Sequence, residues 1–223
     1  MTRGVLFDLY GVVMRVQTPE AIAAIERAAG FGGPDLWEPF WALRAPYDHG
    51  VQSGRAYWAA VAATSGRSIA DPDAVIAAEV AGWSWPDDQM VDYVRGLARR
   101  CPVGVLSDVP VDVIEMLERD QPWIGRLPSV TLSGRVGKGK PDAAVFRLAV
   151  AGLGLAPQDV LFTDDRPRNV EAARRCGLRG VVFEGLDALR PLVDAHLAGR
   201  DVGLPRHGPR SAMVWQPDGI QEE

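Results

Sequence analysis

One stretch of the chain decides the fold: Val5-Leu6-Phe7-Asp8-Leu9-Tyr10-Gly11-Val12, close to the N-terminus. It begins as a short, continuously apolar run, which is typical of a strand covered on both faces in a parallel sheet. Asp8 follows where this strand is predicted to end, and Gly11 permits a tight turn with the backbone close to a ligand. Because ligands bind at the carboxyl ends of the strands in open parallel sheets, Asp8 is a candidate functional residue.

Four later runs repeat this strand-like pattern and are separated by segments with helical periodicity. With residues 4–7, the predicted strands are residues 103–106, 129–132, 160–163 and 180–183. The predicted helices between them are residues 111–119, 142–151 and 167–176, the last one ended by Gly177. This alternation predicts an α/β fold with a doubly wound, Rossmann-like parallel sheet and helices on both faces.

The alternation is interrupted between the first two predicted strands. Residues 18–99 contain no convincing strand, and their helical patterning covers residues 19–29, 37–43, 55–63 and 72–81. We therefore predict a core domain of residues 1–17 and 100–198 and an inserted helical cap of residues 18–99. Residues 199–223 are rich in Gly, Pro and Arg, and we expect a loose C-terminal extension there.

Composition and charge exclude several classes of partner. A formal net charge of −5 over 223 residues lacks the positive field that nucleic acid or an anionic membrane surface requires. No apolar run approaches the roughly 20 residues that span a bilayer. The N-terminus shows no export signal, and there are only two cysteines. We expect a cytoplasmic monomer or homodimer whose partner is a small molecule, with no nucleic acid and no membrane.

Three further strand or helix boundaries carry polar groups that complement Asp8. Ser107 follows one predicted strand, Asp164 and Asp165 follow another, and Lys140 lies just before a predicted helix. Any one of them alone is often a turn or capping residue. Together they supply a nucleophile, a hydroxyl, an ammonium and an acidic pair, the set that phosphoryl transfer needs. Three clustered carboxylates would repel one another without a cation, so the sequence predicts Mg²⁺ held by oxygen ligands.

The order of these motifs resembles that of the haloacid dehalogenase superfamily. The motifs are Asp8-x-Tyr10-Gly11-Val12, Leu106-Ser107-Asp108, Lys140-Pro141-Asp142 and Phe162-Thr163-Asp164-Asp165-Arg166-x-x-Asn169. The helical segment between the first two motifs is similar to the first-type cap of that superfamily. The resemblance covers residues 4 to about 190.

The resemblance implies a hydrolase with a complete set of site residues. Asp8 would attack phosphorus and form an aspartyl-phosphate, with Tyr10 and Lys140 as the other catalytic positions. It further implies that the substrate is a small phosphorylated metabolite bound by Ser107, Asp108 and Lys140, and that Mg²⁺ is bound by Asp8, Asp164, Asp165 and the main-chain carbonyl of Tyr10.

Tyr10 departs from the pattern of the family's phosphatases, which usually carry a second Asp there to protonate the leaving oxygen. General acid–base catalysis is worth ~100- to 10,000-fold, so the chain would be slow unless a cap residue such as Asp48 or His49 substitutes. A Tyr at this position also resembles the 2-haloacid dehalogenases, which attack carbon and use no metal. Those enzymes typically lack the acidic pair that Asp164 and Asp165 form here. A third hypothesis is a weakly active or non-catalytic binder of a phosphorylated metabolite.

Overall fold

The computed structural model describes residues 2–200 of the chain, so most of the predicted C-terminal extension lies outside the described residues. The fold is built on a five-stranded parallel sheet with the strand order β3-β2-β1-β4-β5. The strands are β1 (Gly4–Phe7), β2 (Val103–Ser107), β3 (Ser129–Leu132), β4 (Val160–Asp164) and β5 (Arg179–Val182). The predicted α/β fold with a parallel sheet is confirmed, and each predicted strand lies within one residue of its observed bounds.

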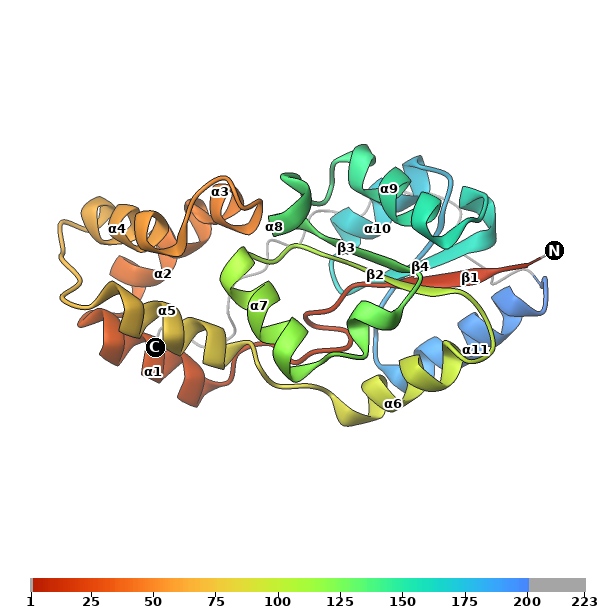
Figure 1. Cartoon of the computed structure of the whole chain (residues 1–223), viewed down its shortest axis with the longest axis horizontal. Helices are drawn as coiled ribbons and strands as arrows, with labels where there is room; N and C mark the ends of the chain where they lie inside the picture. The colour runs from red at the N-terminus through yellow and green to blue at the C-terminus, as the bar shows by residue number, and fades with distance from the viewer. Residues whose placement is uncertain (1, 201–223) are drawn as a thin grey trace, which may run out of the picture.

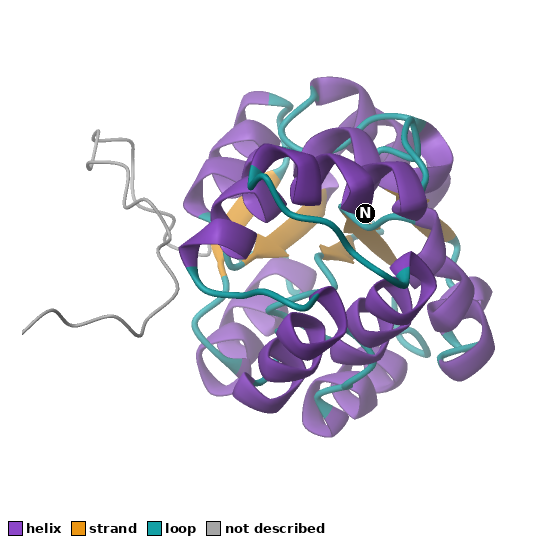
Figure 2. Ribbon diagram, turned by 90° about the vertical axis from the view of Figure 1, so that its left-hand side faces the viewer, coloured by secondary structure: helices purple, strands orange, loops and turns teal. Residues whose placement is uncertain are grey.

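Helices cover both faces of the sheet, as Figures 1 and 2 show. One face packs against α6 (Asp88–Leu97), α7 (Val111–Asp120) and α11 (Leu186–Leu197), whose apolar residues form one buried cluster with β1 and β2. The other face packs against α9 (Ala143–Leu153) and α10 (Pro167–Arg175). Short helices complete the core: α8 (Ser133–Val136) and two 3-10 turns, Ile124–Arg126 and Pro157–Asp159.

The remaining helices form a separate body beyond the carboxyl ends of the strands, on the left of Figure 1. They are α1 (Pro19–Ala29), α2 (Pro34–Ala42), α3 (Arg44–Asp48), α4 (Gly54–Thr64) and α5 (Pro72–Gly82). Their buried residues form their own apolar cluster around Phe40, Tyr57 and Trp58. The apolar residues that recur at helical spacing in this part of the sequence thus pack against one another within this body, and not against the sheet.

Helix α6 does not belong to this second cluster. Met90, Val91, Val94 and Leu97 pack with the core residues below the sheet. We therefore propose that the cap consists of α1 to α5 and that α6, which the sequence analysis assigned to a cap of residues 18–99, belongs to the core. The helix is amphipathic, and its periodicity alone does not say which apolar surface it covers.

A charged network is buried inside the cap. The Arg44 guanidinium donates to Asp48 at 2.7 Å and to Glu79, which is 0% exposed. Glu79 also accepts the indole N–H of Trp58 at 2.9 Å. Arg44 lies over the ring of Phe40, 4.8 Å from the ring centroid. These contacts compensate a buried charge that would otherwise be costly.

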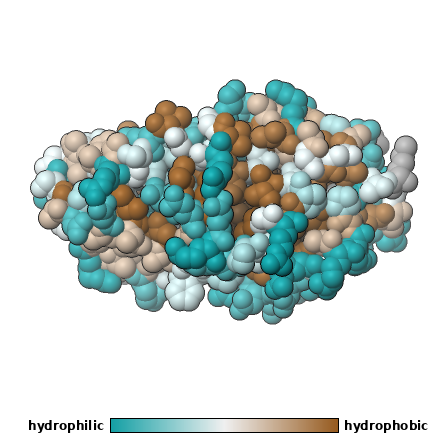
Figure 3. Space-filling model, in the orientation of Figure 1, coloured by the Kyte–Doolittle hydropathy of each residue, from teal (hydrophilic) through white to brown (hydrophobic). Residues whose placement is uncertain are grey.

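The cap rests on the core beside α3. The Ser133 hydroxyl, at the start of α8, donates to the main-chain carbonyl of Asp48 at 2.5 Å. Gly50 has a φ of +67°, and an added Cβ would collide with the carbonyl oxygen of Gly134. Glycine is therefore required where cap and core backbones meet. On the face drawn in Figure 3, apolar side chains gather toward the middle of the molecule, where the two bodies join.

Across residues 2–200, every helix is too short or too polar to span a membrane.

Replacing Glu79 by alanine tests the buried network. Glu79→Ala leaves Arg44 with Asp48 alone and removes the acceptor of the Trp58 indole. We expect the free energy of unfolding to fall by about 3–5 kcal/mol, as for other broken buried ion pairs. Urea denaturation followed by circular dichroism measures the change. Glu38→Ala, at an exposed position of α2, is the control and should change it by less than about 0.5 kcal/mol. Equal effects of the two substitutions would contradict a structural role for Glu79.

Candidate active site

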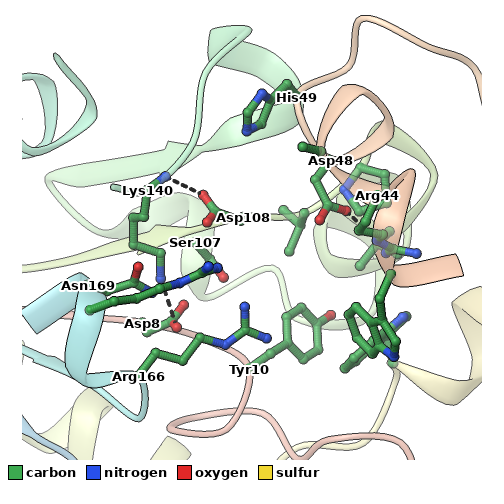
Figure 4. A pocket seen from close by; sticks show the side chains of 17 residues that line it. Asp8, Tyr10, Arg44, Asp48, His49, Ser107, Asp108, Lys140, Arg166 and Asn169 are labelled. Carbon is green, nitrogen blue, oxygen red and sulfur yellow. Dashed lines mark hydrogen bonds and ion pairs between the residues drawn. The ribbon is translucent and has the colours of Figure 1, made fainter. Parts of the chain in front are cut away.

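A cavity of about 290 Å³ lies between the carboxyl ends of the strands and the cap. Figure 4 shows the side chains that line it. The core contributes five of the residues that the sequence analysis singled out: Asp8, Tyr10, Ser107, Asp108 and Lys140. Asp164 and Asp165 lie close to Asp8 at the same edge of the sheet, with carboxylate oxygens of all three residues within 4.8 Å of one another. The structure therefore brings together the residues that the sequence placed far apart.

Lys140 joins two of the carboxylates. Its ammonium nitrogen lies 2.8 Å from Asp8 Oδ2 and 2.7 Å from Asp164 Oδ2, and its side chain is only 2% exposed. Burial alone lowers the pKa of Lys140, but the two carboxylates reverse this effect and raise the pKa above its ordinary value. The group is therefore a fixed cation at the centre of the site.

Asp164 is held by several donors. Its Oδ1 accepts the main-chain N–H of Arg166 at 2.8 Å, and the Asn169 side-chain amide lies 3.1 Å from both carboxylate oxygens. Asn169 is 1% exposed. Asn169 stands within the last of the four sequence motifs, and no role was predicted for it. Its spacing of five residues from Asp164 puts it on the first turn of α10, which is a signal that could have identified it.

Gly11 allows Asp165 to approach the loop that follows Asp8. Gly11 has a φ of +84°, and a Cβ at this position would lie 2.7 Å from Asp165 Oδ2. A side chain here would thus force the carboxylate away. Asp165 Oδ1 is buried and has no hydrogen-bond partner within the described part of the chain. Such an oxygen fits the role of a ligand to a bound cation, which the protein itself does not supply.

Burial makes the ionised forms of two of these carboxylates less favourable. It raises the pKa of Asp8 to about 8, although the Lys140 ammonium opposes the shift and Asp164 adds to it. Burial also raises the pKa of Asp165, again with a contribution from Asp164. Burial thus disfavours the ionised forms of Asp8 and Asp165, and the Lys140 ammonium opposes this effect. The oxygen-only donor set fits a divalent cation such as Mg²⁺, which would restore the balance.

Ser107 is the last residue of β2, and Asp108 follows it. Ser107 is 2% exposed, and its hydroxyl lies close enough to Asp8 to lower the pKa of that carboxyl. Asp108 Oδ1 accepts the main-chain N–H of Lys140 at 2.9 Å. Asp108 thus anchors the loop that carries Lys140, while its side chain also lines the cavity.

Tyr10 turns its side chain toward the cap. Its ring meets Trp83 edge-on with 4.9 Å between ring centroids, and Figure 4 shows its hydroxyl pointing away from Asp8. Burial raises the pKa of this hydroxyl far above its ordinary value, so it stays protonated. The side chain is therefore no substitute for a carboxylic acid at this position, and the main-chain carbonyl of Tyr10 stays a predicted metal ligand.

The cap contributes lining residues that the sequence analysis did not assign to the site, among them Trp41, Arg44 and Trp83. Asp48 and His49, which it named as stand-ins for the missing acid, also line the cavity. In Figure 4, Asp48 lies beside Arg44, across the cavity from Asp8. The cap residues were missed because nothing in a helical pattern shows which face closes a distant cleft.

Two further arginines line the cavity from the core side, Arg166 and Arg168. They flank the first residue of α10, directly after the acidic pair. Both side chains are exposed at the entrance and add positive charge near Asp8. Their position after a strand end was a signal that the sequence analysis did not use.

Two known proteins are similar to this chain in sequence. Flavin mononucleotide hydrolase 1 of Arabidopsis thaliana is 40% identical over 70 residues, which are 31% of this chain and only 28% of that protein. Validoxylamine A 7'-phosphate phosphatase of Streptomyces hygroscopicus subsp. limoneus is 26% identical over 94% of this chain and all of that protein. Both relatives are named as hydrolases of phosphorylated compounds.

Solved structures share the fold. An enzyme of the haloacid dehalogenase family from Bacteroides thetaiotaomicron, in complex with magnesium and inorganic phosphate, matches with a TM-score of 0.67 and 16% identity, over 82% of this chain and 93% of that one. L-2-haloacid dehalogenase from Xanthobacter autotrophicus matches with a TM-score of 0.59 and 20% identity, over 87% and 83%. The family model described as haloacid dehalogenase-like hydrolase matches residues 2–177. The chain therefore belongs to the haloacid dehalogenase-like hydrolases.

Proposed function

We propose that this hydrolase is a Mg²⁺-dependent phosphatase of a small phosphorylated metabolite. The observation that carries the proposal is the cluster of Asp8, Asp164 and Asp165 around one fixed ammonium. A dehalogenase that attacks carbon needs neither three clustered carboxylates nor a metal ion. The rival reading as a 2-haloacid dehalogenase rests on Tyr10 alone.

The proposed reaction begins with Asp8. One carboxylate oxygen attacks phosphorus, an O–P bond forms, and the bond from phosphorus to the ester oxygen breaks, which leaves an aspartyl-phosphate and an alkoxide. The alkoxide takes a proton from water and becomes the alcohol. Lys140 pairs with Asp8 and Ser107 lies close to it, so both are placed to donate to the phosphoryl oxygens, while Arg166 and Arg168 add positive charge to the lining of the cavity. Water then hydrolyses the aspartyl-phosphate and regenerates Asp8.

Mg²⁺ would be held by Asp8, Asp164, Asp165 and the carbonyl of Tyr10. When bound, it neutralises negative charge on the transferring phosphoryl group. Asn169 and the Arg166 N–H orient Asp164, and Gly11 lets Asp165 approach. These residues thus preorganise the ligands before substrate arrives.

The central prediction is Mg²⁺-dependent release of phosphate from small phosphate esters. Asp8→Asn removes the nucleophile and should abolish the release. Asp92→Asn, at an exposed position of α6, is the matched control and should keep the activity of the unmodified chain. A colorimetric phosphate assay measures both. Metal-free halide release from 2-chloropropionate, with no turnover of any ester, would overturn the proposal in favour of the dehalogenase.

The chain's only two lysines, Lys138 and Lys140, provide a matched pair. Lys140→Met removes the cation between Asp8 and Asp164, and kcat should fall roughly 100- to 1,000-fold, as when a preorganised donor is lost. Lys138 is exposed and, within residues 2–200, pairs only with Asp142 at 3.6 Å, so Lys138→Met should change kcat less than about twofold. Comparable losses in both variants would show that general positive charge, and not the position of Lys140, matters.

Metal binding is predicted to raise thermal stability without any substrate. At about a hundredfold excess of Mg²⁺ over its Kd, the melting temperature should rise by roughly 5–10 °C. Asp165→Asn removes a ligand charge at nearly unchanged volume and should reduce this shift. Differential scanning fluorimetry with and without EDTA measures it. An equal shift in the variant would remove Asp165 from the metal site.

A further inference from the structure

The cap side of the cavity carries two polar groups without a protein partner. The Tyr10 hydroxyl and the Trp83 indole Nε1 are both buried, and neither has a hydrogen-bond partner among residues 2–200. Both residues line the cavity. A buried donor without an acceptor is costly, so each group indicates an acceptor atom that a ligand would bring.

The same wall carries an acceptor, the carboxylate of Asp48. It lines the cavity and is fixed by Arg44 at 2.7 Å, while Arg44 is itself fixed by Glu79. Figure 4 shows Asp48 and Arg44 on the side of the cavity away from Asp8. This wall therefore offers donors and an acceptor together, at the end of the cavity that the phosphoryl group does not occupy.

Charge decides which ligand fits this wall. Asp48 and Arg44 line the cavity and form an ion pair, and Arg44 also pairs with Glu79, which is buried and does not line the cavity. The three groups together carry one net negative charge next to this end of the cavity. A carboxylate or a second phosphate would be repelled there. An ammonium could pair with Asp48 but would leave the Tyr10 hydroxyl and the Trp83 N–H without an acceptor. A hydroxyl group both donates and accepts, and so satisfies all three.

We propose that this wall is a subsite for a neutral, polyhydroxylated leaving group, so that the substrate is a sugar or polyol phosphate. The inference rests on the proposed phosphatase function. The rings of Trp41 and Trp83 supply apolar surface for the C–H groups of such a leaving group. A cavity of about 290 Å³ lies at the lower end of the range for small-molecule sites, which favours a single small sugar or polyol.

Three four-carbon phosphate esters test the subsite directly. Butyl phosphate has no hydroxyl groups, erythritol 4-phosphate has them, and 4-phosphoerythronate adds a carboxylate, while all three have a primary leaving oxygen. We expect kcat/KM for erythritol 4-phosphate to exceed that for each of the others by at least roughly tenfold, since two or more hydrogen bonds are gained. A preference for 4-phosphoerythronate would instead assign the leaving-group site to Arg166 and Arg168 and overturn the inference.

Two variants locate the effect. Trp83→Phe keeps an aromatic ring but removes the N–H, and Asp48→Asn removes the charge of the acceptor. Each should lower the ratio of kcat/KM for erythritol 4-phosphate to that for butyl phosphate by roughly fivefold to tenfold. Trp85→Phe is the matched control, because Trp85 is 55% exposed and lies outside the cavity lining, and it should leave the ratio unchanged. An unchanged ratio in both cavity variants would overturn the subsite.

The failure of this inference is distinguishable from the failure of the proposed function. If p-nitrophenyl phosphate and all three esters release no phosphate, the phosphatase function fails and the subsite with it. If p-nitrophenyl phosphate is hydrolysed but the three esters are equal substrates, only the subsite fails. Calorimetric titration of erythritol 4-phosphate into the Asp8→Asn variant adds a readout without turnover. Binding there that Trp83→Phe weakens supports the subsite, and binding that it leaves unchanged contradicts it.

Discussion

The site depends on one ammonium between two buried carboxylates. Lys140 lies within 2.8 Å of both Asp8 and Asp164, and each of the three side chains is at least nine-tenths buried. The parallel sheet creates this crowding, because it ends its strands at one edge and carries Asp8 and Asp164 on neighbouring strands. Charge must then be compensated locally, and Asp165 Oδ1 is buried without a hydrogen-bond partner among residues 2–200. The cluster of carboxylate oxygens at this edge of the sheet fits a divalent cation.

The cap also contains buried charged groups that compensate one another. Its small core buries Arg44 under aromatic rings and pairs it with Asp48 and Glu79, so that the wall facing the cavity is rigid and polar. Tyr10 occupies the position where the family's phosphatases usually carry a second Asp, and its ring packs against Trp83. Tyr10 leaves the site without the usual general acid, and it also lines the place where the proposed leaving group would lie.

Much of the core was predictable from residue patterns. Continuous apolar runs specify buried parallel strands, and polar residues at strand ends, such as Asp8 and Ser107, converge because the strands share one edge. The proposed place of helix α6 in the core differs from the predicted cap of residues 18–99, because amphipathicity gives a buried face and not its partner. Trp83 and the orientation of Tyr10 escaped prediction for a related reason: they depend on how two bodies close on each other, which one-dimensional periodicity does not contain.

The central claim is that Asp8 carries the phosphoryl group during hydrolysis. It is tested most directly by mass spectrometry of enzyme quenched in acid during turnover of a phosphate ester with Mg²⁺ present. The account predicts that the peptide containing Asp8 gains one phosphoryl group, that borohydride reduces this residue, and that the Asp8→Asn variant shows neither change. Steady release of phosphate with no phosphoryl group on that peptide, or with the label on another residue, would contradict it.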